Sequence, residues 1–557
     1  MKALSVPLLI LLLARTARGQ APTPPATPRK EECSVAGMVV KLAGSEPLRK
    51  AKVRLRSLEE RTRAISTTTD SGGGFQLRGI PPGRYNLTVS RVGFVTQTYG
   101  QKKADDPGAI LTLRAGQEMK DLLFRLVPSG VIAGRILDED GEPIPSATVS
   151  ALREAYSEGK RNLFTSTTVE TNDLGEYRLF GLQPGRYFVS AISRGWNRFE
   201  DVQEEDADIH QQGYAKMYYP GTPDAARASS IVIKAGEEIP SVEILMRQVL
   251  VYRIRGHVYN QITHKPGTGT NLFLTSRTNR LEWDFGHQQV IAEKQDASFE
   301  IPDVSPGSYL LTALWFDEGK TYEARVSVDV GNADVEGVAV TVAQGANING
   351  RIIWDGRPAL EKDELTVFAS AVDSNLVFGY DGARVNQANS FTLTNIGEGT
   401  YRADVGGQSK DCYLKDVQYG GAGALEDGFT VGRGSPASLE ITISPRGARV
   451  QGTVSDEGGL PAVGVWVALV PDAAHRAQHR LYKTQTTDQY GHFDLRGVPP
   501  GEYTLFSWEE MESNAWEDPE FLKPFEDQGE KISVQEGNTK SVALTAIKTA
   551  SAEQQKP

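Results

Sequence analysis

The sequence predicts an all-β protein built as a tandem array of about five antiparallel β-sandwiches. One pattern of about 100 residues recurs five times along the chain, which is the signature of a repeated structural unit. Gly and Pro supply 56 and 29 of the 557 residues and accompany many Val, Thr and Tyr residues, a composition that favours strands and tight turns. Each copy holds about seven short strand-like segments separated by turn residues, as antiparallel sandwiches do.

Each copy opens with a strand led by glycine and followed by a tight turn. The leading glycines are Gly37, Gly134, Gly256, Gly350 and Gly452. The turn is clearest at 138–142 (DEDGE), where Asp-Gly and the Pro behind it supply the backbone angles of a short connection. The next strand alternates apolar and polar residues, as in Ala147, Val149 and Ala151, so one of its faces is expected to be buried.

A Thr/Asp/Gly turn then leads to a strand that begins with an aromatic residue, and a tyrosine follows ten residues later in every copy. The five aromatic pairs are Phe75/Tyr85, Tyr177/Tyr187, Phe299/Tyr309, Phe391/Tyr401 and Phe493/Tyr503. One extra residue would turn the following side chains to the opposite face of the sheet. The constant spacing therefore indicates a strand, a tight corner and a returning strand.

The corner is written GIPPGRYNLTV at 79–89 in the first copy. Its Pro-Gly pair predicts a type II turn with glycine at positive φ. The tyrosine two residues later resembles a tyrosine corner, whose ring lies inside the sandwich and whose hydroxyl bonds to the backbone. The structural residues predicted in this way are Gly83, Tyr85, Gly185, Tyr187, Gly307, Tyr309, Gly399, Tyr401, Gly501 and Tyr503.

The copies divide the chain into modules. The predicted segments are a signal peptide at 1–19, a Pro-rich linker at 20–31, sandwiches at 32–128, 129–249, 250–344, 345–446 and 447–549, and a disordered tail at 550–557. The second sandwich carries an aromatic and acidic insertion at 192–229, and the fourth is the most divergent. The connections between copies are short, which predicts a semi-rigid string of modules.

The N-terminus reads as a cleaved export signal. Lys2 precedes an apolar run from Val6 to Leu13, and a small-x-small site predicts cleavage after Gly19. The run is shorter than the ~20 residues that span a bilayer, so we expect no transmembrane segment in the mature chain. These features predict a secreted, periplasmic or cell-surface protein. A formal charge of −11 without a basic stripe argues against nucleic acid as a partner.

Only two cysteines occur, Cys33 and Cys412, and they lie in different copies. A disulfide between them would have to cross domains. Two buried thiols are the favoured interpretation, with the cross-domain bridge as the alternative.

The repeated pattern G-x-V…D-x-x-G-x-P-x-x-x-A-x-V…T-D-x-x-G-x-F…P-P-G-x-Y resembles the carboxypeptidase regulatory-like module. That family has a transthyretin-like, Ig-like Greek-key sandwich, is close to collagen-adhesin B-type repeats, and is often grouped with carbohydrate-binding-like folds. Copies one, two and five carry the pattern well, and copies three and four carry its first strand and its aromatic-to-Tyr corner. The resemblance covers nearly all of 32–549 and implies a bacterial, exported protein. It transfers no catalytic residue.

In metallocarboxypeptidases such a module lies beside a zinc peptidase domain, whose H-x-x-E pair is absent here because none of the seven histidines has Glu three residues later. His475, His479 and His492 could together form a three-His metal site, but a solvated loop that also carries Arg476 and Arg480 is the simpler interpretation. The sequence therefore predicts no enzyme, no metal and no cofactor.

Aromatic residues in two long loops are the candidate ligand-binding residues. They are Trp196, Tyr214, Tyr218 and Tyr219 in the insertion of copy two, and Trp508 and Trp516 in copy five. Aromatic rings in sandwich loops can stack on sugar rings. The alternative is that these rings pack against their own loops or a neighbouring module.

Together these observations predict an exported, non-catalytic binding, adhesion or scaffolding protein, with carbohydrate as the favoured ligand class. The expected partners are polysaccharide or cell-envelope proteins. The alternative is a structural spacer or envelope-assembly component without a small ligand. An accessory module of a peptidase or of a glycan-degrading system is a third reading.

Overall fold

The structure is a computed structural model of the chain. It describes residues 32–59, 64–101, 106–157, 159–193, 212–277, 282–283, 288–317, 320–357, 365–372, 382–432 and 436–549. The predicted signal peptide, linker and tail lie outside the described residues. Among the described residues, no helix is long and apolar enough to cross a membrane.

Five hydrophobic cores follow one another along the chain. They span 33–126, 132–246, 252–342, 348–443 and 448–546, and each lies inside one of the predicted sandwich ranges. We call the corresponding units modules 1 to 5. Each is all-β, with its strands arranged in two main sheets. The predicted fold class is thus confirmed.

Module 1 contains β1 (Cys33–Lys41), β2 (Lys52–Ser57), β3 (Ala64–Thr68), β4 (Gly74–Ile80), β5 (Gly83–Ser90), β6 (Gln97–Thr98), β7 (Leu111–Leu113) and β8 (Glu118–Leu126). Module 2 contains β9 (Gly130–Leu137), β10 (Thr148–Ser157), β11 (Lys160–Glu170), β12 (Glu176–Leu182), β13 (Gly185–Ile192), β14 (Gln212–Tyr214), β15 (Met217–Tyr218), η2 (Ala225–Arg227), β16 (Ile231–Ile233), β17 (Glu238–Ile239) and β18 (Ile244–Leu245). The strand β19 (Gln248–Leu250) leads into module 3.

Module 3 contains β20 (Tyr252–Asn260), β21 (Lys265–Pro266), β22 (Asn271–Ser276), β23 (Glu282–Trp283), β24 (Gln288–Ile291), β25 (Ser298–Val304), β26 (Gly307–Asp317), β27 (Lys320–Val330) and β28 (Val335–Val342). Module 4 contains β29 (Ala346–Trp354), β30 (Thr366–Ala371), β31 (Ala383–Arg384), β32 (Ser390–Ile396), β33 (Gly399–Gly406), β34 (Tyr413–Tyr419), β35 (Ala422–Gly423), β36 (Phe429–Val431) and β37 (Leu439–Ser444).

Module 5 contains β38 (Ala448–Ser455), β39 (Trp466–Pro471), η3 (Ala473–His475), η4 (His479–Leu481), β40 (Lys483–Thr486), β41 (His492–Val498), β42 (Gly501–Trp508), η5 (Ala515–Glu517), α1 (Pro519–Leu522), η6 (Lys523–Phe525), β43 (Glu530–Val534) and β44 (Thr539–Thr545).

The first strand of every module lies between an antiparallel and a parallel neighbour. In module 1, β1 pairs antiparallel with β4 and parallel with β8, and β38 repeats this arrangement between β41 and β44 in module 5. The same parallel pairing of a first with a late strand occurs in modules 2, 3 and 4. Most strand pairs are antiparallel, as the sequence predicts, and the pairing of the first with a late strand adds a parallel pair to each module.

Only glycine fits at the repeated position in each first strand, because the backbone of the neighbouring strand lies very close to it. A Cβ atom at Gly37 would lie 2.1 Å from the carbonyl oxygen of Leu122, and one at Gly452 would lie 1.7 Å from that of Val542. In all five modules this glycine also pairs across the sheet with the aromatic residue that leads the corner strand, as Gly37 does with Phe75. The aromatic ring covers the space that the glycine leaves, so the two repeated residues form one structural unit.

The tyrosine corner is present in all five modules. The Tyr85 hydroxyl donates to the carbonyl oxygen of Pro81 at 2.7 Å, and Tyr187, Tyr309, Tyr401 and Tyr503 make the same bond to the residue four positions earlier, at 2.8–3.1 Å. The corner tyrosines therefore bond to the backbone in the way that the sequence predicts.

The predicted type II turn is wrong. A type II turn needs φ near +80° at its glycine, but φ is 157° at Gly83 and 148° at Gly185 and Gly399. The left-handed residue lies four positions earlier in every module, with φ between 57° and 77° at Gly79, Gly181, Asp303, Asn395 and Gly497. A register shift between the first strand and the corner strand occurs beside each of them. The left-handed residue thus belongs to a β-bulge, which bends the strand into the corner.

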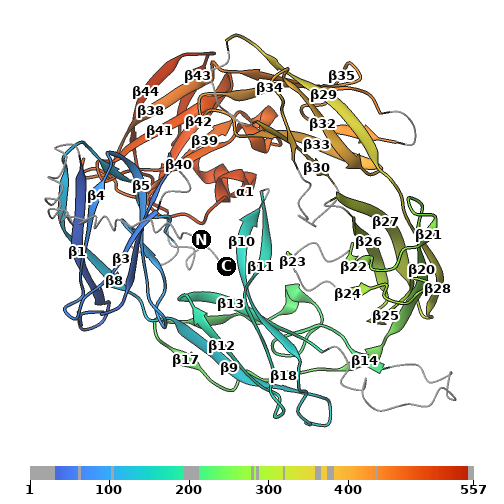
Figure 1. The fold of residues 1–557 in the computed structure, drawn as a ribbon. Coiled ribbons are helices and arrows are strands. Elements are labelled where there is room, and N and C mark those ends of the chain that lie inside the picture. The colour runs from blue at the N-terminus through green and yellow to red at the C-terminus, as the bar shows by residue number, and fades with distance from the viewer. Residues whose placement is uncertain are drawn as a thin grey trace, which may run out of the picture.

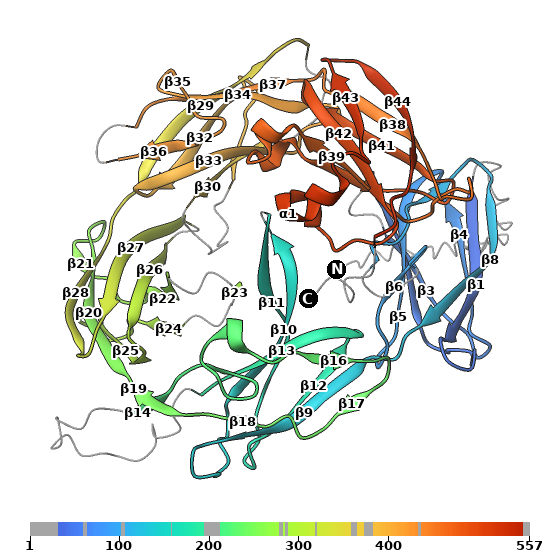
Figure 2. The ribbon, with the colours of Figure 1, turned by 180° about the vertical axis from the view of Figure 1, so that it is seen from behind.

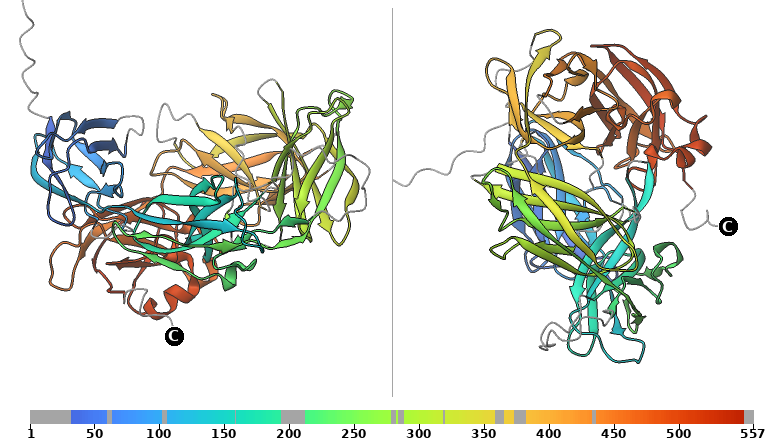
Figure 3. Two further views of the ribbon diagram at one scale, coloured as in Figure 1. Left: turned by 90° about the horizontal axis from the view of Figure 1, so that it is seen from below. Right: turned by 90° about the vertical axis from the view of Figure 1, so that its right-hand side faces the viewer.

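The modules follow one another around a ring and not along a string (Figure 1). Module 1, in blue, lies beside module 5, in orange and red, and the view from behind shows the same neighbours (Figure 2). The view from below keeps these two modules together (Figure 3). Hydrogen bonds between Thr112 and Gln489 confirm the contact. The prediction of an extended string is therefore wrong, because modules 1 and 5, which are far apart in the sequence, bind each other.

A second contact crosses the ring. The hairpin β10–β11 of module 2 extends toward α1 of module 5 (Figures 1 and 2). The Asn514 side chain donates to the carbonyl oxygen of Tyr156 at 3.3 Å, and the Tyr156 ring lies 6.4 Å from that of Phe521. Arg161 and Glu512 lie 3.6 Å apart. Module 5 thus contacts two modules that are not its neighbours in sequence.

Cys33 and Cys412 are buried in two different cores, those of modules 1 and 4. The Cys33 thiol donates to the carbonyl oxygen of Arg114 at 3.0 Å. The structure agrees with two buried thiols and not with a bridge across domains.

Candidate functional site

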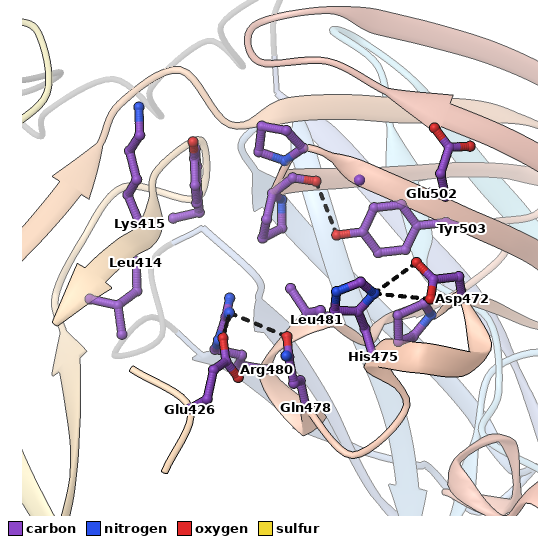
Figure 4. Close-up of a pocket in the computed structure, with 15 residues that line it drawn as sticks. Leu414, Lys415, Glu426, Asp472, His475, Gln478, Arg480, Leu481, Glu502 and Tyr503 are labelled. Atoms are coloured by element: carbon purple, nitrogen blue, oxygen red, sulfur yellow. Dashed lines mark hydrogen bonds and ion pairs between the residues drawn. The ribbon is translucent and has the colours of Figure 1, made fainter. Parts of the chain in front are cut away.

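A cleft of about 560 Å³ lies between modules 4 and 5. Module 4 contributes β34 and Glu426, and module 5 contributes the η3–η4 segment and the corner that precedes β42. Figure 4 shows how Lys415, Arg480, His475 and Tyr503 surround it. Side chains of both modules thus line a common space.

Local structure fixes the side chains of module 5 in the cleft. The Asp472 carboxylate accepts from the backbone N–H of Ala474 at 2.9 Å and so caps η3. Tyr503 is held by its corner bond to Pro499 at 3.0 Å, and burial raises its pKa to about 12. The repeated corner therefore forms one wall of the cleft.

One carboxylate of module 5 binds several groups of module 4. Glu536 of module 5 accepts from the Tyr413 hydroxyl at 3.0 Å and from the Ser444 hydroxyl at 2.5 Å, both of module 4. Arg446 lies 3.2 Å from the same carboxylate. The Ser444 hydrogen bond, followed by the Tyr413 bond and the nearby cations, holds the pKa of Glu536 below its ordinary value. This junction sets the width of the cleft.

The charged groups that line the cleft occur as partners. Arg480 donates to Glu426 across the module boundary and lies 3.4 Å from the Gln478 amide oxygen. His475 Nδ1 lies 2.8 Å from Asp472, whose pKa this hydrogen bond lowers. Lys415 contacts Asp355, and this hydrogen bond raises the pKa of its ammonium group. Positive and negative groups thus alternate around the space.

One nitrogen of the cleft residue Arg480 lacks a hydrogen-bond acceptor in the described part of the chain. The Arg480 Nε atom is buried and has no hydrogen-bond partner among the described residues. A buried donor without a partner is unfavourable by about 1–3 kcal/mol.

Hydrogen bonds hold the acidic side chains that line the cleft in place. The carboxylates of Glu426, Asp472 and Glu502 all accept hydrogen bonds from protein groups, the last from the Ser533 hydroxyl at 2.6 Å. What the arrangement offers is a set of donors and acceptors in fixed positions.

The three histidines considered for a metal do not converge. His475 lies beside Asp472, His479 Nδ1 is 2.9 Å from Glu517, and His492 Nδ1 is 3.7 Å from Asp488. Within the described ranges, no group of three or more His, Cys, Asp or Glu side chains could hold a metal ion. Each imidazole contacts its own carboxylate instead.

Three of the predicted ligand-binding aromatics are buried. Trp508 is 0% exposed and Trp516 3%, because they form a second core of module 5 with Phe506, Leu522 and Phe525. Tyr218 is 1% exposed and packs on Leu152 and Leu163 of the module 2 hairpin. A ring without an exposed face cannot stack on a sugar, so the structure removes these three from the candidate set, in favour of the alternative that such rings pack their own loops.

The other predicted aromatics have different positions. Tyr214 and Tyr219 are half-buried. Tyr214 accepts from the Gln248 amide at 3.5 Å, and burial, followed by the nearby acidic turn at 138–140, raises its pKa. Its strand β14 pairs with β19 at the junction of modules 2 and 3. Trp196 lies outside the described residues.

Sequence reasoning missed the cleft because its residues come from two modules. Lys415 and Glu426 lie in the most divergent copy, where the repeat gives no guide. The sequence predicts a solvated loop around Arg480, and no residue near it in the sequence indicates that Glu426 is its partner. The one available signal was that the η3–η4 segment at 472–482 has no counterpart of similar length in copy one.

Comparison with known families identifies part of the chain. Residues 34–126 and 131–209 match the model of the carboxypeptidase regulatory-like domain. Two segments of this tandem β-sandwich protein thus match the carboxypeptidase regulatory-like domain. A search of curated proteins finds no match to the chain.

Several solved structures are similar to parts of the chain. The TIE protein of Bacillus anthracis is 14% identical over 56% of this chain and 51% of that chain, with a TM-score of 0.16. The minor pilin GBS52 of Streptococcus agalactiae is 12% identical over 39% and 96%, with a TM-score of 0.23. The major pilin subunit BcpA of Bacillus cereus is 8% identical over 56% and 99%, with a TM-score of 0.14. The chain spans about half the length of the TIE protein.

Proposed function

We propose that this chain is an exported, non-catalytic binding and scaffolding protein whose favoured ligand is a carbohydrate. The observation that carries the proposal is the cleft between modules 4 and 5, where Arg480, Gln478 and Glu426 place donors and acceptors side by side. The family match adds a module that by itself brings no catalytic residue.

The mixture of charges favours a neutral, hydroxyl-rich ligand. An anion would lie close to Glu426, Asp472 and Glu502, and a cation would lie close to Lys415 and Arg480. A sugar hydroxyl both donates and accepts, so it can bond to carboxylates, amides and guanidinium groups alike. The volume of the cleft is within the range of small-ligand sites.

The half-buried Tyr214, with Gln248 and the acidic turn at 138–140 beside it, is a second location for the same ligand class. It combines an aromatic ring of the insertion with acids and an amide from outside it. The purely structural alternative, a spacer or envelope-assembly component, is favoured by the buried Trp508 and Trp516, which serve only packing.

A glycan array tests the proposal. We expect the purified protein to bind one class of glycans, and Gln478→Trp to weaken that binding at least about tenfold because the added ring fills the cleft. The matched control is Gln528→Trp, at an exposed position of the same module that does not line the cleft.

Each other outcome has one meaning. No binding, or equal binding to all glycans, would contradict the carbohydrate ligand. Selective binding that Gln478→Trp leaves unchanged and Tyr214→Ala abolishes would place the site in module 2 and contradict the cleft.

A further inference from the structure

The ring closes where a turn of module 5 meets the edge of a sheet in module 1. The Gln489 side chain accepts from the backbone N–H of Thr112 at 3.0 Å and donates to the carbonyl oxygen of the same residue at 2.6 Å. Ile110 also forms a β-bridge with Asp488. The amide of Gln489 thus takes the place of a neighbouring strand beside β7.

A second set of contacts surrounds this pair. The Thr112 hydroxyl donates to Asp488 at 3.0 Å, and the Gln117 amide donates to the Tyr490 hydroxyl at 3.3 Å. The Arg114 guanidinium lies 5.1 Å from the centre of the Tyr490 ring. These distances are those of specific polar recognition and of a cation–π contact.

Asp488 serves both modules at once. One of its oxygens accepts from the backbone N–H groups of Tyr490 and His492, each at 2.9 Å, and so holds the turn, while the other accepts from Thr112. Asp488 is 7% exposed. The same carboxylate therefore shapes the turn and binds module 1.

The contact is particular to copy five. The corresponding turn carries Ser71 and Gly72 in copy one and Asp173 and Leu174 in copy two, where copy five has Gln489 and Tyr490. Asp173 and Leu174 are exposed. Only the turn of module 5 combines an amide and a ring that fit Thr112 and Arg114.

We propose that module 5 is a releasable clasp that closes the ring mainly through two contacts, one on β7 of module 1 and one on the tip of the β10–β11 hairpin of module 2. The first contact consists of hydrogen bonds and a cation–π contact around the largely buried Asp488. The second adds the Tyr156–Phe521 ring contact to one hydrogen bond and one partly exposed ion pair. Each of the polar interactions is worth about 1 kcal/mol. The five cores are separate from them, so the clasp can open while every module stays folded.

Opening of the clasp would expose a sheet edge of module 1. The backbone groups of Thr112 that Gln489 satisfies become an exposed sheet edge, and such edges pair with other chains. The closed ring therefore protects module 1 from association, and the open form is expected to self-associate.

Small-angle scattering on the full chain tests the clasp. The test protein carries Gln489→Ala and Tyr490→Ala on the first contact and Tyr156→Ala and Arg161→Ala on the second. We expect its radius of gyration to rise by roughly a quarter or more over the unchanged protein, as a compact chain becomes an open one.

The control protein carries Asp173→Ala, Leu174→Ala and Lys160→Ala, exposed positions of an equivalent turn and of the same hairpin. It is expected to scatter as the unchanged protein does. Far-ultraviolet circular dichroism must show the same strand content in both variants. An unchanged radius in the folded clasp variant, or an equal rise in the control, would overturn the proposal, and so would loss of strand content in the clasp variant alone, since its cores would then depend on the clasp.

Discussion

Three arginines surround the carboxylate of Asp494 where module 5 meets module 1. Arg449 and Arg496 of its own module lie 2.6 and 2.8 Å from it, and Arg84 of module 1 lies 3.9 Å away. Partial burial by itself would raise its pKa, but the hydrogen bonds from Arg449 and Arg496 outweigh this and hold the pKa below its ordinary value.

This shift predicts loss of stability in acid. Because the pKa of Asp494 is lower in the folded state than in the unfolded state, its contribution is present above pH 4 and is lost as the pH falls through the folded pKa. We expect Asp494→Asn to lower the urea midpoint of module 5 at pH 7 and to reduce the further loss between pH 4 and pH 2. A variant with the same acid dependence as the unchanged protein would contradict this role.

At this scale the sequence was informative where the five copies agree. The Tyr85 hydroxyl bond could be predicted from spacing, and the Gly37–Phe75 pair is the physical reason for two positions that the copies share. The burial of Trp508 and Trp516 could not be predicted. An aromatic residue in a long loop has the same sequence pattern whether it faces solvent or packs into a second core.

At the scale of elements, the hairpin of module 2 departs from that of module 1. The strands β10 and β11 have 10 and 11 residues, where β2 and β3 have 6 and 5. The added length carries Gly159 to module 5, where a Cβ atom would lie 2.7 Å from the carbonyl oxygen of Glu517. The longer strands β10 and β11 therefore bridge the ring from module 2 to module 5, and we call this hairpin the spoke.

Gly159→Ala tests this spoke, and Gly141→Ala is its matched control. Both glycines are left-handed, with φ of 68° and 85°, but a Cβ atom at Gly141 meets nothing within 4 Å. Gly141→Ala is expected to lower the free energy of unfolding by about 1–2 kcal/mol from backbone strain. Gly159→Ala should lower it by at least about 1 kcal/mol more, because the Glu517 backbone must move. Equal urea denaturation curves for the two variants would contradict the contact.

The strands and turns could largely be predicted, but two features of the elements could not. The Pro-Gly pair at 82–83 is typical of a type II turn, yet the left-handed residue is Gly79, because a β-bulge makes the bend. The parallel pairing of β1 with β8 joins residues about 85 positions apart, and alternating burial looks the same for either strand direction.

At the scale of the whole molecule, the predicted string becomes a ring. Short connections limit how consecutive modules sit, but they do not decide whether the ends meet. That is decided by Gln489 and Thr112, which are 377 positions apart and carry no local signal of their pairing. The cleft between modules 4 and 5 was out of reach for the same reason, since Glu426 and Arg480 belong to different copies.

Closure also gives the chain a property that a string lacks. Modules 4 and 5 belong to a closed ring, so the ligand that we propose for the cleft would be held by a frame and not by two hinged domains. Pre-organised sites of this kind bind with less loss of conformational freedom. The frame is therefore expected to matter for affinity even though modules 1 and 2 do not line the cleft.

Small-angle X-ray scattering of the unchanged protein at neutral pH tests the central claim most directly. A closed ring predicts a radius of gyration below about 30 Å, near the roughly 24 Å of a compact chain of this length. A string of five modules joined end to end would give roughly twice the compact value, and a radius of that size would contradict the ring.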